Sequence, residues 1–285
     1  MFLSAPFMIL EYAFFQNAII GSLLASILCG IVGTYIVTRR LVFISGGLTH
    51  ASFGGIGLGV FLGLNPVISA MVFATASALG VQWMSNRGDV REDSAIAMFW
   101  TLGMSVGIIF SFLTPGFMSD LTSYLFGSIL TVGSGDVWLL AVLTLIVSLI
   151  FIFFYRQILS VAFDRIFAHS QHLPVNLIEY GMMVIIALTI VAVLRLVGIV
   201  LAISLLTIPQ MTANLLTHSY KRMIFISILF GWIDCFCGLF ASYWLNVPSG
   251  ASIICVSILL FVTIKGLTLL RKNRKNRQPT RHTSI

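Results

Sequence analysis

Residues 41–63, LVFISGGLTHASFGGIGLGVFLG, decide the fold of this chain. The stretch is apolar enough to lie in a lipid bilayer, yet it carries one ionisable side chain, His50. A histidine inside a membrane helix is energetically costly and marks a candidate functional residue. Small residues recur at every fourth position and share one helix face, on which another helix can approach closely. They are Gly47, Ala51, Gly55, Gly59 and Gly63. The stretch predicts a closely packed membrane helix whose imidazole lines a pathway.

The composition of the whole chain predicts a polytopic membrane protein. Of its 285 residues, 59% are hydrophobic and only 9% are charged, whereas a soluble domain carries about 25% charged residues. The net charge of +7 does not indicate nucleic-acid binding, because six of the sixteen basic residues lie in residues 271–281. Such a basic tail is typical of a topology anchor near anionic membrane lipid. No nucleic-acid partner is expected.

Nine apolar segments approach the roughly 20 residues that a spanning helix needs. The second is short and rich in glycine, and the sixth and seventh abut across residues 195–198. The sequence therefore predicts an all-α transmembrane bundle of eight or nine spanning helices. The segments cover residues 14–37, 44–63, 66–84, 94–113, 137–155, 178–195, 198–217, 223–245 and 249–269.

The charges between the segments predict the orientation of the bundle. With the C-terminus inside, only one of the flanking basic residues, Arg195, falls outside, in agreement with the positive-inside rule. The N-terminus is then outside, as are the acids Glu11, Asp120 and Asp136. Residues 156–177 lie inside and predict a short surface helix that ends before Pro174. Residues 114–136 lie outside and predict a re-entrant or surface helix.

The seventh segment carries a polar stripe. Its members recur at spacings of three and four, which predicts one continuous helix face. Pro209 removes a backbone donor and leaves the Leu205 carbonyl without its helical partner, and Gln210 follows directly. Two interpretations stay open for each side chain: hydrogen bonding between helices, or lining a pathway. The stripe as a whole favours a pathway. It comprises Ser204, Thr207, Met211, Asn214 and His218.

Asp234 lies deep in the eighth segment, where a carboxylate is seldom unpaired. It is interpreted either as a structural hydrogen-bonding acid or as a group that binds a cation. An imidazole such as His50 with oxygen neighbours such as Thr49 fits zinc, manganese or ferrous iron without choosing among them. His169 and His172 fall in the inside connection, where surface roles are expected.

Several motifs are absent from the sequence. No G-x-x-x-x-G-K-[ST] motif occurs, so the chain is not expected to bind ATP through a P-loop. Neither HExxH, nor GxSxG, nor a catalytic pair of carboxylates is present. The sequence gives no basis for an enzyme.

An ordered series of motifs resembles the ABC-type zinc/manganese permeases. It begins with the stretch around residues 41–63 and continues with REDSAIAMFW, SYLFGSIL, FDRIFAHSQHLPV, LLTIPQMTANLL and VPSGASIICV, over about residues 11–267. The resemblance implies the importer permease fold of the vitamin B12/metal-chelate type in a bacterial plasma (inner) membrane. Residues 1–270 would form the permease domain and residues 271–285 a basic cytoplasmic tail.

The resemblance also implies partners and roles. The chain would form a homodimer with a pathway at its interface and bind two cytoplasmic ATP-binding subunits, which hydrolyse ATP. An extracytoplasmic metal-binding protein would deliver the divalent metal ion, and no permanent cofactor is expected. Residues 163–175 match the coupling helix that seats on the ATPase, and His50 matches a histidine in the metal pathway. The coupling residues are Phe163, Asp164, Arg165, Phe167 and His169.

The chain departs from the family pattern at three positions. Where the family often reads G-D-A-L-S-H-A, residues 45–51 read SGGLTHA, so Gly46 replaces an aspartate one turn before His50. His172 stands where a glycine is common, and Asp234 has no usual charged counterpart. We hypothesise that Asp234 compensates for the carboxylate missing at Gly46.

Two other classes of function remain open. A channel or secondary carrier would work without an ATPase and would be expected to show inverted repeats with paired broken helices, whereas one clear proline break is present. A non-transporting membrane scaffold would leave His50 and the polar stripe unexplained. The leading hypothesis is the membrane-spanning half of an ATP-driven metal importer that works by alternating access.

Overall fold

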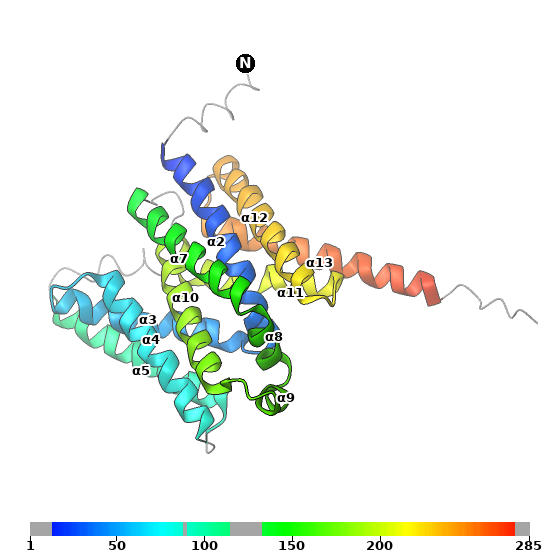
Figure 1. Ribbon diagram of the computed structural model, residues 1–285. Coiled ribbons are helices and arrows are strands. Elements are labelled where there is room, and N and C mark those ends of the chain that lie inside the picture. The colour runs from blue at the N-terminus through cyan, green and yellow to red at the C-terminus, as the bar shows by residue number, and fades with distance from the viewer. Residues whose placement is uncertain (1–12, 88–89, 115–132, 277–285) are drawn as a thin grey trace, which may run out of the picture.

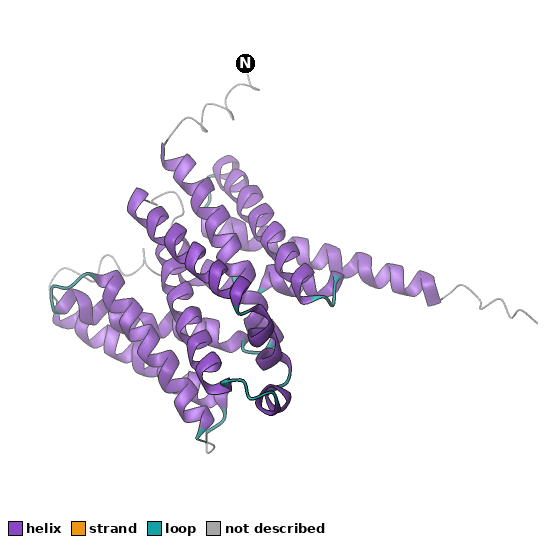
Figure 2. Cartoon of the chain, in the orientation of Figure 1, coloured by secondary structure: helices purple, strands orange, loops and turns teal. Residues whose placement is uncertain are grey.

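The computed structural model describes residues 13–87, 90–114 and 133–276, and all regular structure in these ranges is helical (Figures 1 and 2). The all-α prediction is therefore confirmed. The predicted helix within residues 114–136 and the end of the basic tail fall largely outside the described residues. The helices are α2 (Ala13–Thr38), α3 (Val42–Phe61), α4 (Pro66–Asn86), α5 (Glu92–Leu113), α7 (Ser134–Phe153), α8 (Tyr155–Phe163), α9 (Arg165–Ser170), α10 (Val175–Leu205), α11 (Ile208–Leu216), α12 (Tyr220–Leu245) and α13 (Ser249–Asn276).

Helix α10 lies at the centre of the bundle. It contacts α2, α3, α4, α7 and α13, and most of its apolar length is buried inside the chain. Helices α3, α4 and α5 pack together on one side of it, whereas α12 and α13 lie on the other side (Figure 1). Helix α13 is largely exposed and extends away from the bundle, so the described chain leaves broad apolar faces uncovered.

Turn chemistry explains where individual helices begin and end. Helix α4 starts at Pro66, and the side chain of Asn65 caps it by accepting a 2.9 Å hydrogen bond from the Val67 amide. Helix α12 ends at Asn246, which adopts the left-handed conformation with φ +52°.

The predicted count of eight or nine spans is not confirmed. Among the described residues, seven helical segments are long and apolar enough to cross a membrane. Helix α3 is not one of them, because glycine, hydroxyl side chains and His50 lower its hydropathy. The predicted sixth and seventh spans appear as one stretch, Val175–Leu216. The exclusion of α3 and this merger together reduce the nine predicted segments to seven.

This long stretch is interrupted twice. Gly198 has φ +78° and ψ 173°, so the chain kinks at the predicted boundary between the sixth and seventh segments. Helix α10 then ends at Leu205, and α11 begins at Ile208 with Pro209 in its first turn, where a missing amide costs little. The expectation that residues 204–218 form one continuous helix face is therefore wrong.

Helix α3 packs through its small residues against two neighbours, α4 and α5. A Cβ at Gly47 would lie 2.3 Å from Ile96 of α5, and one at Gly55 would lie 2.5 Å from the Ser69 carbonyl oxygen of α4. Gly59 also faces Ser69, and Ala51 meets Gly103 of α5. Such distances leave no room for a side chain, so these glycines permit the close approach of the helices.

Two details of this packing differ from the prediction. Gly54 and Gly57, outside the four-residue spacing, face the backbone of Gly103 and Gly107 on α5. Gly63, expected on the packed face, instead follows the end of α3 with φ +69°, and a Cβ there would meet nothing within 4 Å. Its role is to turn the chain after α3.

The two ends of the bundle differ in charge. One end, called the basic end below, carries Arg39, Arg87, Arg165 and Lys221. At the other end, the Arg195 Nε atom lies 3.1 Å from an Asp136 carboxylate oxygen. The charge pattern predicted that these two residues lie on the same side, and the ion pair confirms that part of the topology.

Candidate functional site

His50 lies on the one face of α3 that the described chain leaves open. Phe43, Gly46 and His50 follow each other at spacings of three and four, and none is fully buried. The His50 ring stacks on Trp100 of α5, with 4.7 Å between ring centroids and 4° between ring planes. The His50 Nδ1 atom is buried without a hydrogen-bond partner. The imidazole is therefore held in one orientation with an unused polar atom.

Gly46 leaves space beside this imidazole. A Cβ added there would meet nothing closer than the Ile203 Cδ1 atom, at 3.9 Å, which is an ordinary van der Waals contact. Ile203 belongs to the second half of α10 and directly precedes Ser204, whose hydroxyl is buried without a partner. The open face of α3 therefore adjoins the start of the predicted polar stripe.

Thr49 does not share this face. Its side chain is fully buried, and its hydroxyl donates to the Ser45 carbonyl within α3. A hydroxyl bonded to its own helix needs no further partner. The structure therefore places Thr49 in the packing of α3 rather than beside the imidazole.

The polar stripe divides at the break before α11. Ser204 and Thr207 are buried, and Thr207 donates a 2.8 Å hydrogen bond to the Ile203 carbonyl. Beyond the break, the stripe members are exposed in the single chain: Met211, Asn214 and His218. The described fold does not bring these exposed residues together with His50.

Gln210 satisfies the backbone group that Pro209 frees. Its Nε2 atom donates to the Leu205 carbonyl at 3.0 Å and to the Cys29 carbonyl of α2 at 2.8 Å. A freed carbonyl inside a membrane bundle is tolerated where protein groups bond it. Gln210 is fully buried and ties the broken span to α2, so its observed contacts are structural.

Asp234 makes its contact with α13 rather than with α3. It is buried, and one carboxylate oxygen accepts a hydrogen bond from the Ser257 hydroxyl, while the other has no partner. Helix α12 packs against α2, α11 and α13, whereas α3 packs chiefly against α4 and α5. The geometry of one chain therefore gives no support to compensation by Asp234 for Gly46. Over the described ranges, no three His, Cys, Asp or Glu side chains are placed to hold a metal ion.

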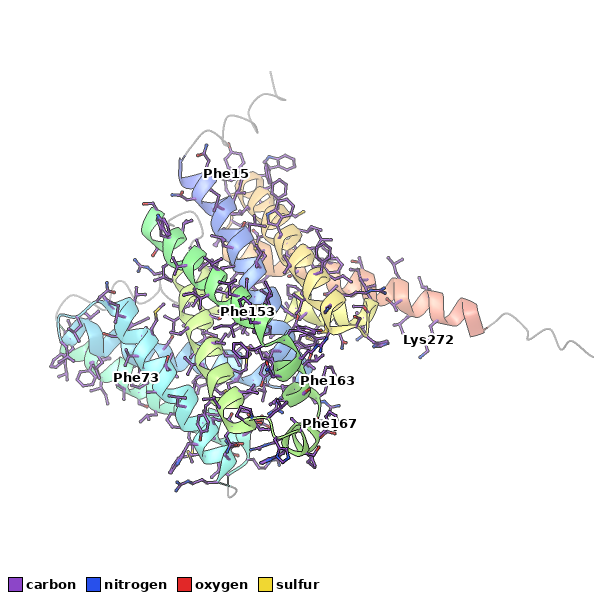
Figure 3. All side chains as sticks on the ribbon, viewed as in Figure 1. Phe15, Phe73, Phe153, Phe163, Phe167 and Lys272 are labelled. Atoms are coloured by element: carbon purple, nitrogen blue, oxygen red, sulfur yellow. The ribbon has the colours of Figure 1, made fainter. Side chains whose placement is uncertain are left out.

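The predicted coupling segment, residues 163–175, comprises the last residue of α8, the short helix α9 and the turn that leads into α10, and Asp164 joins α8 to α9. The Asp164 carboxylate caps α9 by accepting a 2.9 Å hydrogen bond from the Phe167 amide. Phe163 and Phe167 are exposed at the basic end, as Figure 3 shows, and Ile166 between them is 84% exposed. His169 is exposed as well. The segment therefore presents an apolar surface outward.

Glu179 of α10 anchors this segment to the bundle. Its carboxylate is 2% exposed and lies 3.2 Å from Arg39, just after α2, and 3.3 Å from Arg165 of α9. Gln82 of α4 donates to it at 3.2 Å, and Arg39 also donates to the Val161 carbonyl of α8 at 3.1 Å. One buried acid thus joins four parts of the basic end.

Comparison with known proteins identifies the family. The model of the ABC 3 transport family matches residues 11–266, which is nearly the whole chain. The chain belongs to the ABC 3 transport family.

Relatives in sequence span the same region. An uncharacterized membrane protein of Synechocystis sp. is 41% identical over 89% of this chain and 90% of its own length. The manganese transport system membrane protein MntC of Halalkalibacterium halodurans is 34% identical over 89% of this chain and 87% of its own.

Two solved structures share the fold. PsaBC from Streptococcus pneumoniae, in complex with Fab, matches with a TM-score of 0.82 and 30% identity over 93% of this chain and 95% of that chain. An inward-facing, putative metal-chelate type ABC transporter matches with a TM-score of 0.65 and 16% identity over 90% of this chain and 85% of that chain. The ABC permease architecture that the motifs implied is thus supported.

Within this ABC 3 chain, sequence reasoning missed Trp100 and Glu179. Glu179 had a signal, since it is an isolated acid at the start of an apolar segment. Trp100 had none, because its stacking on His50 depends on how α5 packs against α3.

His172, one of the three positions that depart from the resemblance, adopts a backbone conformation that favours glycine. Its φ is +55°, in the left-handed region that favours glycine. We expect His172→Gly to keep or raise stability, whereas His172→Val should lower the free energy of unfolding by about 1–2 kcal/mol. Thermal unfolding of the purified variants measures this. Equal stability of the two variants would contradict the interpretation.

Proposed function

We propose that this chain is the membrane-spanning permease subunit of an ATP-driven importer of a divalent transition metal, with manganese as the first candidate. The observation that carries the proposal is His50, an imidazole with an unpartnered nitrogen on the open face of α3. A buried polar group without a partner invites a ligand, and imidazole binds manganese, ferrous iron and zinc. Manganese comes first because relatives such as MntC are named as manganese transport proteins.

The proposed pathway starts at His50 and Gly46 and continues past Ser204 and Thr207. Two copies of the chain would face each other across it, which supplies the ligands that one chain lacks. Met211, Asn214 and His218 would line its further course, since they are exposed in the single chain. An ion in transit must be bound weakly enough to leave, so a sparse set of ligands suits transport.

ATP hydrolysis is assigned to a partner chain. The exposed Phe163, Ile166 and Phe167 offer an apolar surface on which an ATP-binding subunit can dock. Arg165 and Glu179 then pass its movement to α10, so that the pathway opens alternately to each side. In this arrangement the basic end is cytoplasmic, the N-terminus is outside, and an extracytoplasmic metal-binding protein delivers the ion.

Reconstitution tests this function. The chain, its ATP-binding subunit and the metal-binding protein in proteoliposomes should show ATP hydrolysis that rises with manganese-loaded binding protein, together with manganese uptake. An ATP-binding subunit with an inactivated P-loop serves as the control and should abolish uptake. Flux that continues with this control would favour a channel or carrier, and no response to manganese, zinc or iron would reject the proposal.

A further inference from the structure

A cleft at the basic end has no role in the proposed pathway. Its volume is about 710 Å³, and it lies between the end of α7, the start of α8 and the start of α12. Its floor reaches Ile31 of α2. The cleft therefore opens where the membrane spans end, at the level of the lipid headgroups of one leaflet.

The walls of this cleft are apolar and uncovered. Ile152 and Phe153 at the end of α7 are 70% and 76% exposed, and Ile224 of α12 lines the facing wall. Phe153 lies where α7 passes into α8 (Figure 3). Large apolar side chains at this depth are stable beside acyl chains but not in water.

The rim of the cleft is positively charged. Arg156 and Lys221 both line it, and its described lining contains no Asp or Glu. Neither cation forms an ion pair with an acid in the part of the chain that the structure describes. The Lys221 Nζ atom instead lies 5.1 Å from the centre of the Tyr155 ring. Two unpaired cations in one cleft attract an anion.

Gln157 adds an unused hydrogen-bond acceptor. Its Oε1 atom is buried and has no hydrogen-bond partner, although the residue lines the cleft. Such an acceptor can take a hydrogen bond from a donor in the cleft. A hydroxyl on a lipid headgroup supplies that donor, whereas a choline headgroup carries none.

We propose that this cleft binds one anionic phospholipid with a hydroxylated headgroup, of which phosphatidylglycerol is the simplest. Its phosphate is held by Arg156 and Lys221, its headgroup hydroxyl by Gln157, and its acyl chains lie along α7 and α12. Basic pockets between membrane helices on the cytoplasmic side bind such headgroups. The lipid would fasten α8 to α12, and this role does not depend on which substrate is transported.

Lipid titration of the purified full-length chain tests the proposal. Delipidated protein in neutral detergent is mixed with phosphatidylglycerol or phosphatidylcholine of the same acyl chains, and native mass spectrometry counts the bound lipid. Since each basic residue attracts anionic lipid about fivefold, the double variant Arg156→Gln/Lys221→Gln should bind phosphatidylglycerol about 25-fold more weakly. Phosphatidylcholine binding should be unchanged.

Matched variants keep the test decisive. Arg91→Gln/Arg222→Gln removes the same charge from exposed residues outside the cleft and should bind phosphatidylglycerol like the unmodified chain. If both double variants bind phosphatidylglycerol equally weakly, the attraction is unspecific and the proposal is overturned. If the double variant of the cleft fails to fold, each single variant should still show the fivefold loss.

Two further outcomes would also overturn the proposal. Glycerol phosphate without acyl chains is titrated in place of the lipid, and binding as tight as that of phosphatidylglycerol would indicate a free phosphate site. A change of oligomeric state in Arg156→Gln/Lys221→Gln, with lipid binding unaltered, would indicate that a second copy of the chain covers the cleft.

Discussion

Arg165→Gln is expected to uncouple ATP hydrolysis from transport while leaving the fold intact. Arg165 is 47% exposed, so its ion pair with Glu179 contributes less than about 1 kcal/mol to stability. This ion pair nevertheless joins α9 to the buried acid of α10. Arg165 also donates a 3.1 Å hydrogen bond to Asn86 of α4. Losing it should disconnect the coupling segment from the bundle.

The measurement is made in proteoliposomes that contain the ATP-binding subunit and the metal-binding protein. ATP hydrolysis by Arg165→Gln should continue, but its stimulation by metal-loaded binding protein and the metal uptake should fall about tenfold or more. Arg87→Gln is the control, because Arg87 lies at the same end over the Trp83 ring, 5.2 Å from its centre. A normal ratio of uptake to hydrolysis in Arg165→Gln would contradict the role.

Glu179→Gln separates stability from coupling. Glu179 is buried, and its replacement removes the ion pair that it forms with Arg39, which is 22% exposed. Removing one member of a buried pair costs about 3–5 kcal/mol, because the other charge stays desolvated. This variant should therefore unfold at a lower temperature, whereas Arg165→Gln should not. If both variants unfold like the unmodified chain, the network is not important for the fold.

The Glu179 network shows what the sequence cannot reveal. Its partners lie 140, 97 and 14 positions away along the chain, and each distance depends on how whole helices pack. Periodicity identifies faces of single helices, so it found the packed face of α3 with Gly47, Gly55 and Gly59. It failed for the polar stripe, because one residue pair, Leu206 and Thr207, breaks the helix and rotates the two halves relative to each other.

Features set by neighbouring residues in the sequence were easier to predict than the packing of separate helices. Pro209 implied a freed Leu205 carbonyl, and the structure shows that Gln210 bonds it. The boundary predicted at residues 195–198 is a kink at Gly198 within one stretch rather than a turn between two spans. By contrast, the close approach of Gly54 and Gly57 to α5 could not be predicted, since it depends on where α5 places Gly103 and Gly107.

His50→Ala is expected to cause the largest loss of metal uptake. Altering a residue that merely supports a metal ligand already costs about 10–100-fold in affinity or activity, so removal of the ligand itself should cost at least as much. The fold should tolerate the change, because His50 is half-buried and its main contact is the stack on Trp100. Uptake of radioactive manganese by a transport-deficient strain measures the effect. Unchanged uptake would remove His50 from the pathway.

Gly46→Asp tests the same site in the opposite direction. A Cβ at this position has room, and its carboxylate would lie one turn from His50 on the open face of α3. Since oxygen ligands suit manganese better than softer ligands do, uptake should shift toward manganese and away from zinc in a competition assay. Gly46→Asn, of equal size but without charge, should shift it much less.

Asp234→Asn and Gly46→Asp together test the hypothesis that Asp234 compensates for the carboxylate missing at Gly46. If Asp234 supplies the charge that Gly46 lacks, Asp234→Asn should reduce uptake, and adding Gly46→Asp should restore it. In one chain, however, Asp234 contacts Ser257 of α13, so any such role requires that two copies bring α12 near α3. Unchanged uptake in Asp234→Asn would show that His50 works without this carboxylate. The buried Asp234–Ser257 pair would then serve only to join α12 to α13.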